Sequence, residues 1–103
     1  MDEIEKFGRR IGCEFGAEKV ILFGSYAQGA VTDTSEVELL VIGPFEGKSV
    51  DKSREIRAKL RPEFPVNLLI RTAQKVRQQI QKGDDFMREI VEEGKVLYEA
   101  KGS

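Results

Sequence analysis

The sequence predicts a single α+β domain over residues 1–103, in which a mixed β-sheet is flanked by helices. The length of 103 residues suits one domain of ordinary size. A hydrophobic content of 40% together with 34% charged residues is typical of a globular chain with one core. Helical and strand-like spacings of apolar residues alternate along the sequence, which predicts helices and strands in one α+β domain.

The chain is predicted to open with a helix followed by a central strand. Apolar side chains recur at helical spacing near the start, namely Ile4, Phe7, Ile11 and Phe15. This spacing predicts an amphipathic helix over Asp2–Phe15 that ends at Gly16. Lys19–Phe23 follows as a short β-branched and aromatic run. Because its apolar character is unbroken, we expect a strand that is covered on both faces and lies inside the sheet.

A second strand is predicted after a short helical turn at Tyr26–Gly29 and a polar loop over residues 32–35. This strand spans Glu36–Ile42. Successive side chains of a strand point to opposite faces of the sheet, so Glu36 and Glu38 share one face with Leu40. The other face is apolar and carries Val37, Leu39 and Val41.

A helix and a third strand follow a turn-rich connection over residues 43–47. The apolar spacing predicts the helix over Val50–Leu60, and Pro62 and Pro65 close it. The third strand is predicted over Val66–Arg71. Its alternation places Asn67 on the face opposite to that of its first residue.

Two helices and an edge strand complete the predicted domain. Thr72 is a candidate N-cap for a helix that runs toward Lys82. Asp84 is a second candidate N-cap, for a helix that stops at Gly94. Lys95–Glu99 then has the character of a short edge strand.

The composition excludes several kinds of site and location. The sequence contains no histidine and one cysteine, Cys13, which excludes Ser-His-Asp and Cys-His catalysis, internal disulfides and multi-cysteine zinc sites. A bound metal would therefore have oxygen ligands. No apolar run approaches the roughly 20 residues of a membrane helix, and the acidic start does not have the build of a signal peptide. We therefore expect a cytoplasmic protein with no membrane partner.

Charge is distributed unevenly along the chain, although the net charge is −1. Ten basic and three acidic residues lie between Lys48 and Lys82, a local charge of +7. Such a segment either faces a polyphosphate or nucleic-acid backbone, or simply forms two solvated helix faces. The overall balance argues against general nucleic-acid binding by the domain.

Four features of the sequence resemble the polymerase-beta-like nucleotidyltransferase fold. Gly24 and Ser25 end the first strand, ten residues separate Ser25 from the acidic pair Glu36 and Glu38, and Asn67 lies on the third strand. In this family a Gly-Ser is followed by two aspartates one residue apart and by a third carboxylate on a later strand. The order of elements also resembles the minimal nucleotidyltransferases, over nearly the whole chain. The carboxylates have diverged, because Glu36, Glu38 and Asn67 stand where three aspartates are expected.

The resemblance implies a site for transfer of a nucleoside monophosphate to a hydroxyl, and the expected reaction is transfer of AMP from ATP. Gly24 and Ser25 would contact the phosphates, and Arg71, at the end of a strand, is a further candidate for such a contact. Glu36 and Glu38 would hold Mg²⁺ or Mn²⁺, and Asn67 would stand at the third catalytic position. Valine at position 24 would block the phosphates, and the fold would survive it if the turn needs no positive φ.

Three functions remain open at the level of the sequence. The first is a minimal nucleotidyltransferase whose activity is weak or lost, since an amide at position 67 cannot accept a proton. The second is an inactive nucleotide- or protein-binding module, such as the antitoxin-like partner of a HEPN-type protein, which the family resemblance implies. The third is an unrelated α+β domain in which Glu36 and Glu38 merely form the polar start of a strand, while Asn67 and Arg71 have no catalytic role.

Overall fold

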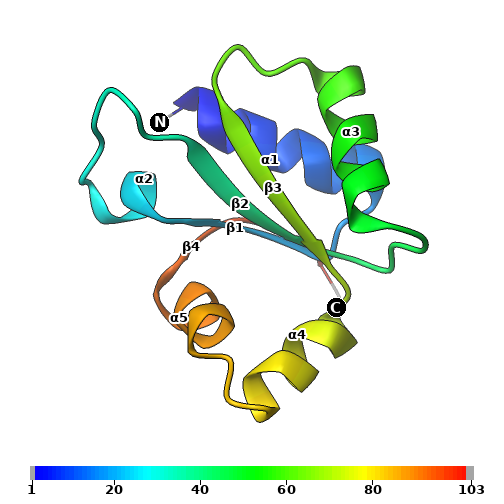
Figure 1. The fold of residues 1–103 in the computed structure, drawn as a ribbon. Coiled ribbons are helices and arrows are strands. Elements are labelled where there is room, and N and C mark those ends of the chain that lie inside the picture. Colours follow the sequence, from blue (N-terminus) through cyan, green and yellow to red (C-terminus); the bar gives the residue numbers. More distant parts are fainter. Residues whose placement is uncertain (1, 102–103) are drawn as a thin grey trace.

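The computed structural model describes residues 2–101, which form five helices and four strands (Figure 1). The elements in chain order are α1 (Asp2–Phe15), β1 (Lys19–Phe23), α2 (Ser25–Gln28), β2 (Val37–Ile42), α3 (Ser49–Leu60), β3 (Val66–Arg71), α4 (Ala73–Gln81), α5 (Asp85–Glu93) and β4 (Lys95–Glu99). The predicted bounds of α1, β1, β3 and β4 are confirmed. β2 begins one residue later than predicted, so Glu36 lies just before the strand.

The four strands form one mixed sheet in the order β3-β2-β1-β4. β1 is antiparallel to both of its neighbours, whereas β2 and β3 are parallel. The prediction that β1 lies inside the sheet and that β4 lies at its edge is therefore confirmed. The parallel pair arises because α3 carries the chain back along the sheet between β2 and β3, as parallel pairing requires.

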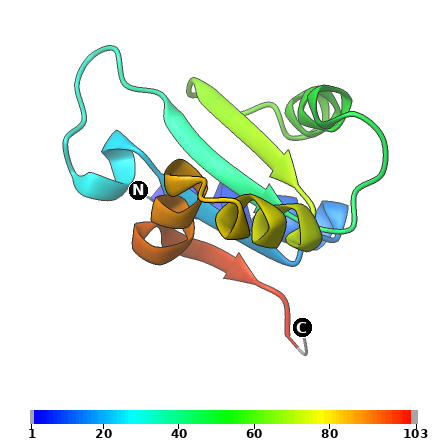
Figure 2. The ribbon, with the colours of Figure 1, turned by 60° about the horizontal axis from the view of Figure 1, so that its bottom comes forward.

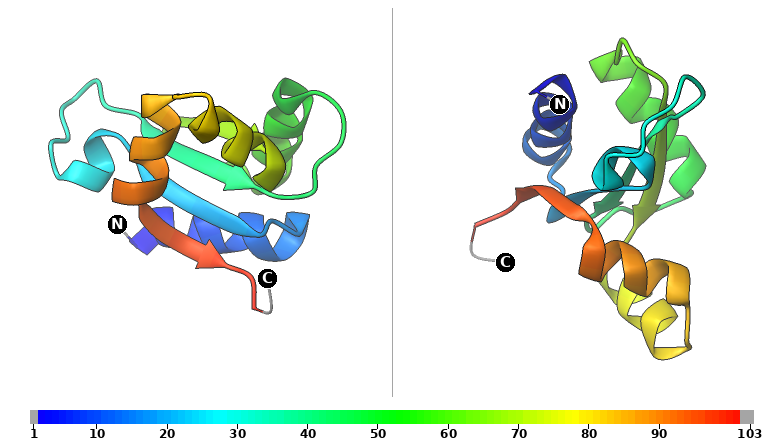
Figure 3. Two further views of the ribbon diagram at one scale, coloured as in Figure 1. Left: turned by 90° about the horizontal axis from the view of Figure 1, so that it is seen from below. Right: turned by 90° about the vertical axis from the view of Figure 1, so that its left-hand side faces the viewer.

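Helices cover both faces of the sheet, with α1 and α3 on one side and α4 and α5 on the other (Figure 3). The strands alternate between the two layers. The core with α1 and α3 contains Val20, Leu22, Val37, Leu39, Val41, Leu68 and Ile70 from the sheet. The core with α4 and α5 contains Ile21, Phe23, Leu40 and Ile42. Figure 2 shows α4 and α5 lying across their face of the sheet. The expected shared helical cover of the strands is thus confirmed.

Two glycines let α1 approach the edge strand β4. A Cβ on Gly12 would overlap the ring of Tyr98, and a Cβ on Gly8 would lie 2.9 Å from Leu97 Cδ1. Interior glycine costs a helix about 1 kcal/mol relative to alanine. The packing of β4 against α1 therefore depends on residues that are unfavourable for the helix alone.

Side-chain caps begin the two C-terminal helices where the sequence predicts them. The Thr72 hydroxyl accepts a hydrogen bond from the Lys75 backbone N–H at 3.1 Å, and Asp84 Oδ1 accepts one from the Met87 N–H at 3.0 Å. Each cap satisfies an N–H group that has no partner inside its helix. Within the described chain, no helix is long and apolar enough to cross a membrane.

Candidate functional site

The turn that follows β1 brings the backbone of Gly24 against the carboxylate of Glu38. Gly24 has φ of 77°, a conformation that side chains disfavour. A Cβ at this position would collide with Glu38 Oε2. The condition under which valine at position 24 would leave the fold intact is therefore not met, because the turn has a positive φ and the Glu38 carboxylate fills the space beside it.

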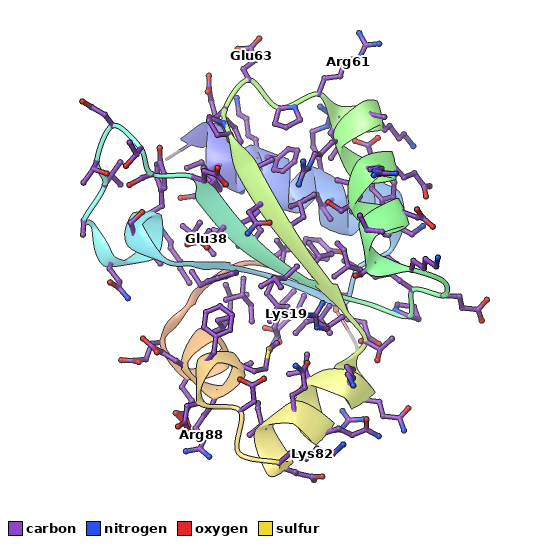
Figure 4. All side chains as sticks on the ribbon, viewed as in Figure 1. Lys19, Glu38, Arg61, Glu63, Lys82 and Arg88 are labelled. Carbon is purple, nitrogen blue, oxygen red and sulfur yellow. The ribbon has the colours of Figure 1, made fainter. Side chains whose placement is uncertain are left out.

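The strand register places Glu38 between the end of β1 and Asn67. Glu38 is opposite Phe23 on the antiparallel side and opposite Asn67 on the parallel side. Neighbouring strands lie about 4.8 Å apart, so Glu38 and Asn67 are adjacent on the sheet. Both belong to the register positions that face α4 and α5. Figure 4 shows Glu38 on the part of β2 nearest α2.

A cavity of about 370 Å³ opens beside Gly24 and Glu38. Its other side is formed by α5, which contributes Phe86, Glu89 and Glu93. The rings of Phe23 and Phe86 meet edge to face, with centroids 5.7 Å apart. The residues from α5 were not predicted from the sequence. Their spacing places them along one side of a helix, but only the packing of α5 on β1 shows which residues that side meets.

Glu36 and Asn67 line a different cavity from Glu38. This second cavity, of about 520 Å³, lies where α3 ends and β3 begins, and Arg57 and Arg61 also line it. Both Glu36 and Asn67 are exposed. The structure thus brings Glu38 to Gly24 and to Asn67, but it does not bring Glu36 and Glu38 into one cavity.

Arg71 lies at the other end of β3 from Asn67. It pairs with Ile42, the last residue of β2, and its guanidinium donates a hydrogen bond to the Ile70 carbonyl at 2.8 Å. Four residues of strand correspond to about 13 Å. The structure therefore does not bring Arg71 to the Gly24–Ser25 turn, and it lines a third cavity instead.

The side chains present do not form a ready metal centre. Among residues 2–101, no group of three or more His, Cys, Asp or Glu side chains is arranged to hold a metal ion. Magnesium prefers near-ideal octahedral oxygen geometry at about 2.0 to 2.1 Å, which these glutamates do not supply together. Glu38, Glu89 and Glu93 give the first cavity a negative charge, and its described lining contains no basic residue.

The Gly24–Ser25 turn leads into α2, where an anion would meet backbone N–H groups. Ser25 and Tyr26 are the first two residues of α2, and the first N–H groups of a helix have no partner within it. Ser25 as a residue is half-buried at the same point. α2 has only four residues, so its dipole adds little, and hydrogen bonds from the turn would provide most of the attraction.

Comparison with known sequences places this arrangement in a family. The family described as "Polymerase beta, Nucleotidyltransferase" matches residues 13–102. A protein of Methanocaldococcus jannaschii, named as a proposed protein adenylyltransferase, is 32% identical over 83 residues, which are 79% of this chain and 78% of the relative. The resemblance that rests on Gly24, Ser25, Glu36 and Glu38 is thereby confirmed at the level of the family.

Solved structures with the same fold extend the comparison. A proposed nucleotidyltransferase from Sulfolobus solfataricus has a TM-score of 0.63 at 17% identity, covering 99% of this chain and 82% of its own. A mutant of the toxin–antitoxin complex MntA–HpeT has a TM-score of 0.56 at 20% sequence identity. A toxin–antitoxin complex with AMP-PNP has a TM-score of 0.59 at 19% sequence identity. Each match covers 97% of this chain and 73% of the solved chain. From the family match and the fold together, this chain belongs to the polymerase beta nucleotidyltransferase family.

Proposed function

We propose that this chain is a minimal nucleotidyltransferase-like protein that binds ATP at the Gly24–Ser25 turn and transfers AMP to a hydroxyl acceptor weakly or not at all. The observation that carries the proposal is the contact between Gly24 and the Glu38 carboxylate, with Asn67 adjacent to Glu38 on the next strand. At this end of the sheet, the proposed phosphate-binding turn after β1 lies beside the carboxylate on β2.

The comparisons support a nucleotide as the ligand. One of the similar structures contains AMP-PNP, and the relative from M. jannaschii is named for adenylyl transfer. In this chain, the phosphates would accept hydrogen bonds from the Ser25 hydroxyl and from the backbone of the turn. The aromatic side chains Phe23 and Phe86 would give the nucleotide apolar contacts in the same cavity.

The residues at the site explain why transfer would be weak. The reaction forms a bond between the acceptor oxygen and the α-phosphorus, breaks the bond from that phosphorus to the bridging oxygen, and releases pyrophosphate. The acceptor must also lose its proton. The Asn67 amide cannot take this proton, and three glutamates in the cavity repel the triphosphate.

We propose that a divalent ion, Mg²⁺ or Mn²⁺, enters with the nucleotide and takes Glu38 as a side-chain ligand. Glu36 lines the second cavity, so its side chain would have to turn toward Glu38 to become another ligand. Such an ion would offset the charge of the phosphates. Glutamate is one methylene longer than aspartate, so its carboxylate reaches the ion from a displaced position. A protein of this kind would act in the cytoplasm, where ATP is available.

A second candidate function is an inactive module that recognises a protein partner. Two of the similar structures are toxin–antitoxin complexes, and one of these is a mutant with two aspartate-to-glutamate substitutions at positions two apart. Glu36 and Glu38 have the same residue type and spacing in this chain. The candidate is thus an antitoxin-like partner of a HEPN-type protein that retains the fold and has lost transfer.

Calorimetric titration with ATP tests the proposal and separates the two candidates. We expect saturable binding that strengthens when Mg²⁺ or Mn²⁺ is added, and little label transferred from α-labelled ATP to protein hydroxyl groups. Absence of ATP binding with either metal would overturn the nucleotide site and leave the protein-binding module. Rapid magnesium-dependent transfer by the unaltered chain would show that Asn67 does not limit the reaction.

A further inference from the structure

A basic cavity lies at the opposite end of the sheet from the Gly24–Ser25 turn. It has a volume of about 480 Å³, within the range of small-molecule sites. Four cationic side chains line it, Lys48 and Lys52 from the start of α3, Arg71 from the end of β3 and Lys75 from the first turn of α4, against the single acid Glu46. These four belong to the basic segment between residues 48 and 82, whose charge the proposed transfer site does not use.

The topology of the sheet explains why a crevice forms here. β2 and β3 are parallel, so their carboxyl ends lie at the same edge. The chain leaves β2 for α3 on one face of the sheet and leaves β3 for α4 on the other face. Adjacent parallel strands whose following helices diverge in this way leave a crevice beyond the strand ends, and ligands of open α/β sheets bind at such positions.

The electrostatic character of the crevice favours an anion. The helices α3 and α4, with 12 and 9 residues, both begin at its rim, so their positive ends add to the charge of the side chains. Lys52 forms an ion pair with Glu55 at 3.1 Å. Lys48 and Lys75, in contrast, form no ion pair with any residue of the described chain and remain available to a ligand.

One lining residue, Gln79, carries a buried acceptor without a partner among the described residues. Gln79 Oε1 is buried and has no hydrogen-bond partner among residues 2–101, although the side-chain nitrogen of Gln79 donates to Asp84 Oδ2 at 3.2 Å. A buried acceptor that is left unpaired costs about 1 to 3 kcal/mol. This acceptor is closed to solvent, so a ligand hydroxyl would reach it only after the Gln79 side chain turns toward the cavity. Such a contact would favour an organic phosphate over an inorganic one.

We propose that this cavity is a second, separate anion site, which binds an organic molecule with two phosphate groups through Lys48, Arg71 and Lys75. The phosphate contact expected for Arg71 from the sequence belongs here, about 13 Å along β3 from Asn67. An extended nucleic acid would need a longer basic track than one cavity. A compact bisphosphate fits both the volume and the concentrated charge.

Titration of the full chain with glucose bisphosphate and with inorganic pyrophosphate tests the proposal. Amide resonances in nuclear magnetic resonance spectra report the place of binding. We expect saturable shifts at Ser49 and at Thr72–Lys75, with the sugar bisphosphate binding more tightly. Lys75→Gln and Arg71→Gln should each weaken binding about tenfold, since each removes a charge-assisted hydrogen bond.

Matched controls keep the outcome specific. Lys82→Gln and Arg77→Gln each remove one positive charge from α4 or its end, but neither residue belongs to the described lining of the cavity. Each should alter the affinity for the sugar bisphosphate less than twofold. Lys82 lies at the far end of α4 (Figure 4). Ser25→Ala should leave the binding of the sugar bisphosphate intact, although it weakens ATP binding. Equal losses in cavity and control variants, shifts confined to Gly24 and Ser25, or tighter binding of a single-stranded oligonucleotide would each overturn the proposal.

Discussion

At the scale of single residues, Gly24 and Glu38 depend on each other. Gly24 has a positive φ, which favours glycine because it has no Cβ. The Glu38 carboxylate occupies the space where a side chain would be. Any substitution of Gly24 therefore disturbs the turn and displaces Glu38 together. Ser25, the next residue, can lose its hydroxyl without either effect, so it is the better residue with which to examine ligand binding.

Ser25→Ala should weaken ATP binding about ten- to a hundredfold while leaving the melting temperature unchanged. The hydroxyl would donate to a charged phosphate oxygen, and such hydrogen bonds contribute about 1.5 to 3 kcal/mol. Isothermal titration calorimetry provides the affinity. Ser35→Ala is the matched control. The Ser35 hydroxyl accepts a hydrogen bond from the Thr32 N–H within the loop, so its loss should not change the affinity for ATP. Equal affinities for Ser25→Ala and the parent would remove Ser25 from the site.

Helix α5 connects fold stability to the candidate site, since it forms one wall of the cavity beside Gly24. Its N-cap, Asp84, accepts hydrogen bonds from the Met87 N–H and from Gln79. Asp84→Ala should lower the free energy of unfolding by about 0.5 to 2 kcal/mol, the usual cost of losing a cap. Urea unfolding measures this. Asp85→Ala, one residue later and fully outside the cap, should cost clearly less, and similar losses in the two variants would contradict the capping role.

The contact between α1 and β4 predicts a loss of stability for a glycine-to-alanine change that helix propensity alone would predict to be stabilising. Alanine in place of an interior glycine normally stabilises a helix by about 1 kcal/mol. Gly12→Ala should destabilise this protein, because the added Cβ overlaps the Tyr98 ring. Thermal unfolding compares it with Cys13→Ala, at the exposed neighbouring position. A rise in melting temperature for Gly12→Ala would show that β4 does not pack closely on α1.

The sequence predicted best the elements that are marked by local signals, such as a capping residue or an apolar run. Thr72 and Asp84 cap α4 and α5 as expected. An unbroken apolar run locates β1, and a short run rich in Val, Leu and Ile locates β3. β2 was predicted one residue too long, because alternation alone could not show that Glu36 lies outside the ladder. The wall that α5 adds to the site could not be predicted, since it results from packing between segments about 65 residues apart in the chain.

At the scale of the whole molecule, the two ends of the sheet have opposite character. The end with Gly24 and Glu38 is acidic in its described lining, whereas the end with Arg71 is basic. The sequence shows the uneven distribution of charge. Only the structure shows that the acidic and basic residues line two separate cavities. Arg71 was assigned to the first site from its place at a strand end, and only the parallel pairing of β2 and β3 shows that this end is the far one.

The acidic end predicts a clear order of metal preference for any residual activity. Transfer from ATP should be slight, and it should be greater with Mn²⁺ than with Mg²⁺, because manganese accepts oxygen ligands and tolerates displaced glutamates better. Counting labelled AMP on acceptor protein, with each metal at equal concentration, measures this. Stronger transfer with Mg²⁺ than with Mn²⁺ would contradict the view that ligand geometry limits the site.

The central claim, that positions 36, 38 and 67 form a diverged metal site, is tested most directly by restoring three aspartates. The variant Glu36→Asp, Glu38→Asp and Asn67→Asp should be stabilised by Mg²⁺ more than the parent, because a ligand that binds only the folded state raises its stability. Asn67→Asp alone should gain less. Gln81→Glu, an exposed amide-to-acid change on α4, controls for added charge. The measurement is the shift in melting temperature with Mg²⁺. A larger shift for the triple variant than for every control is the predicted result, and a folded triple variant with no larger shift than the parent would contradict the claim.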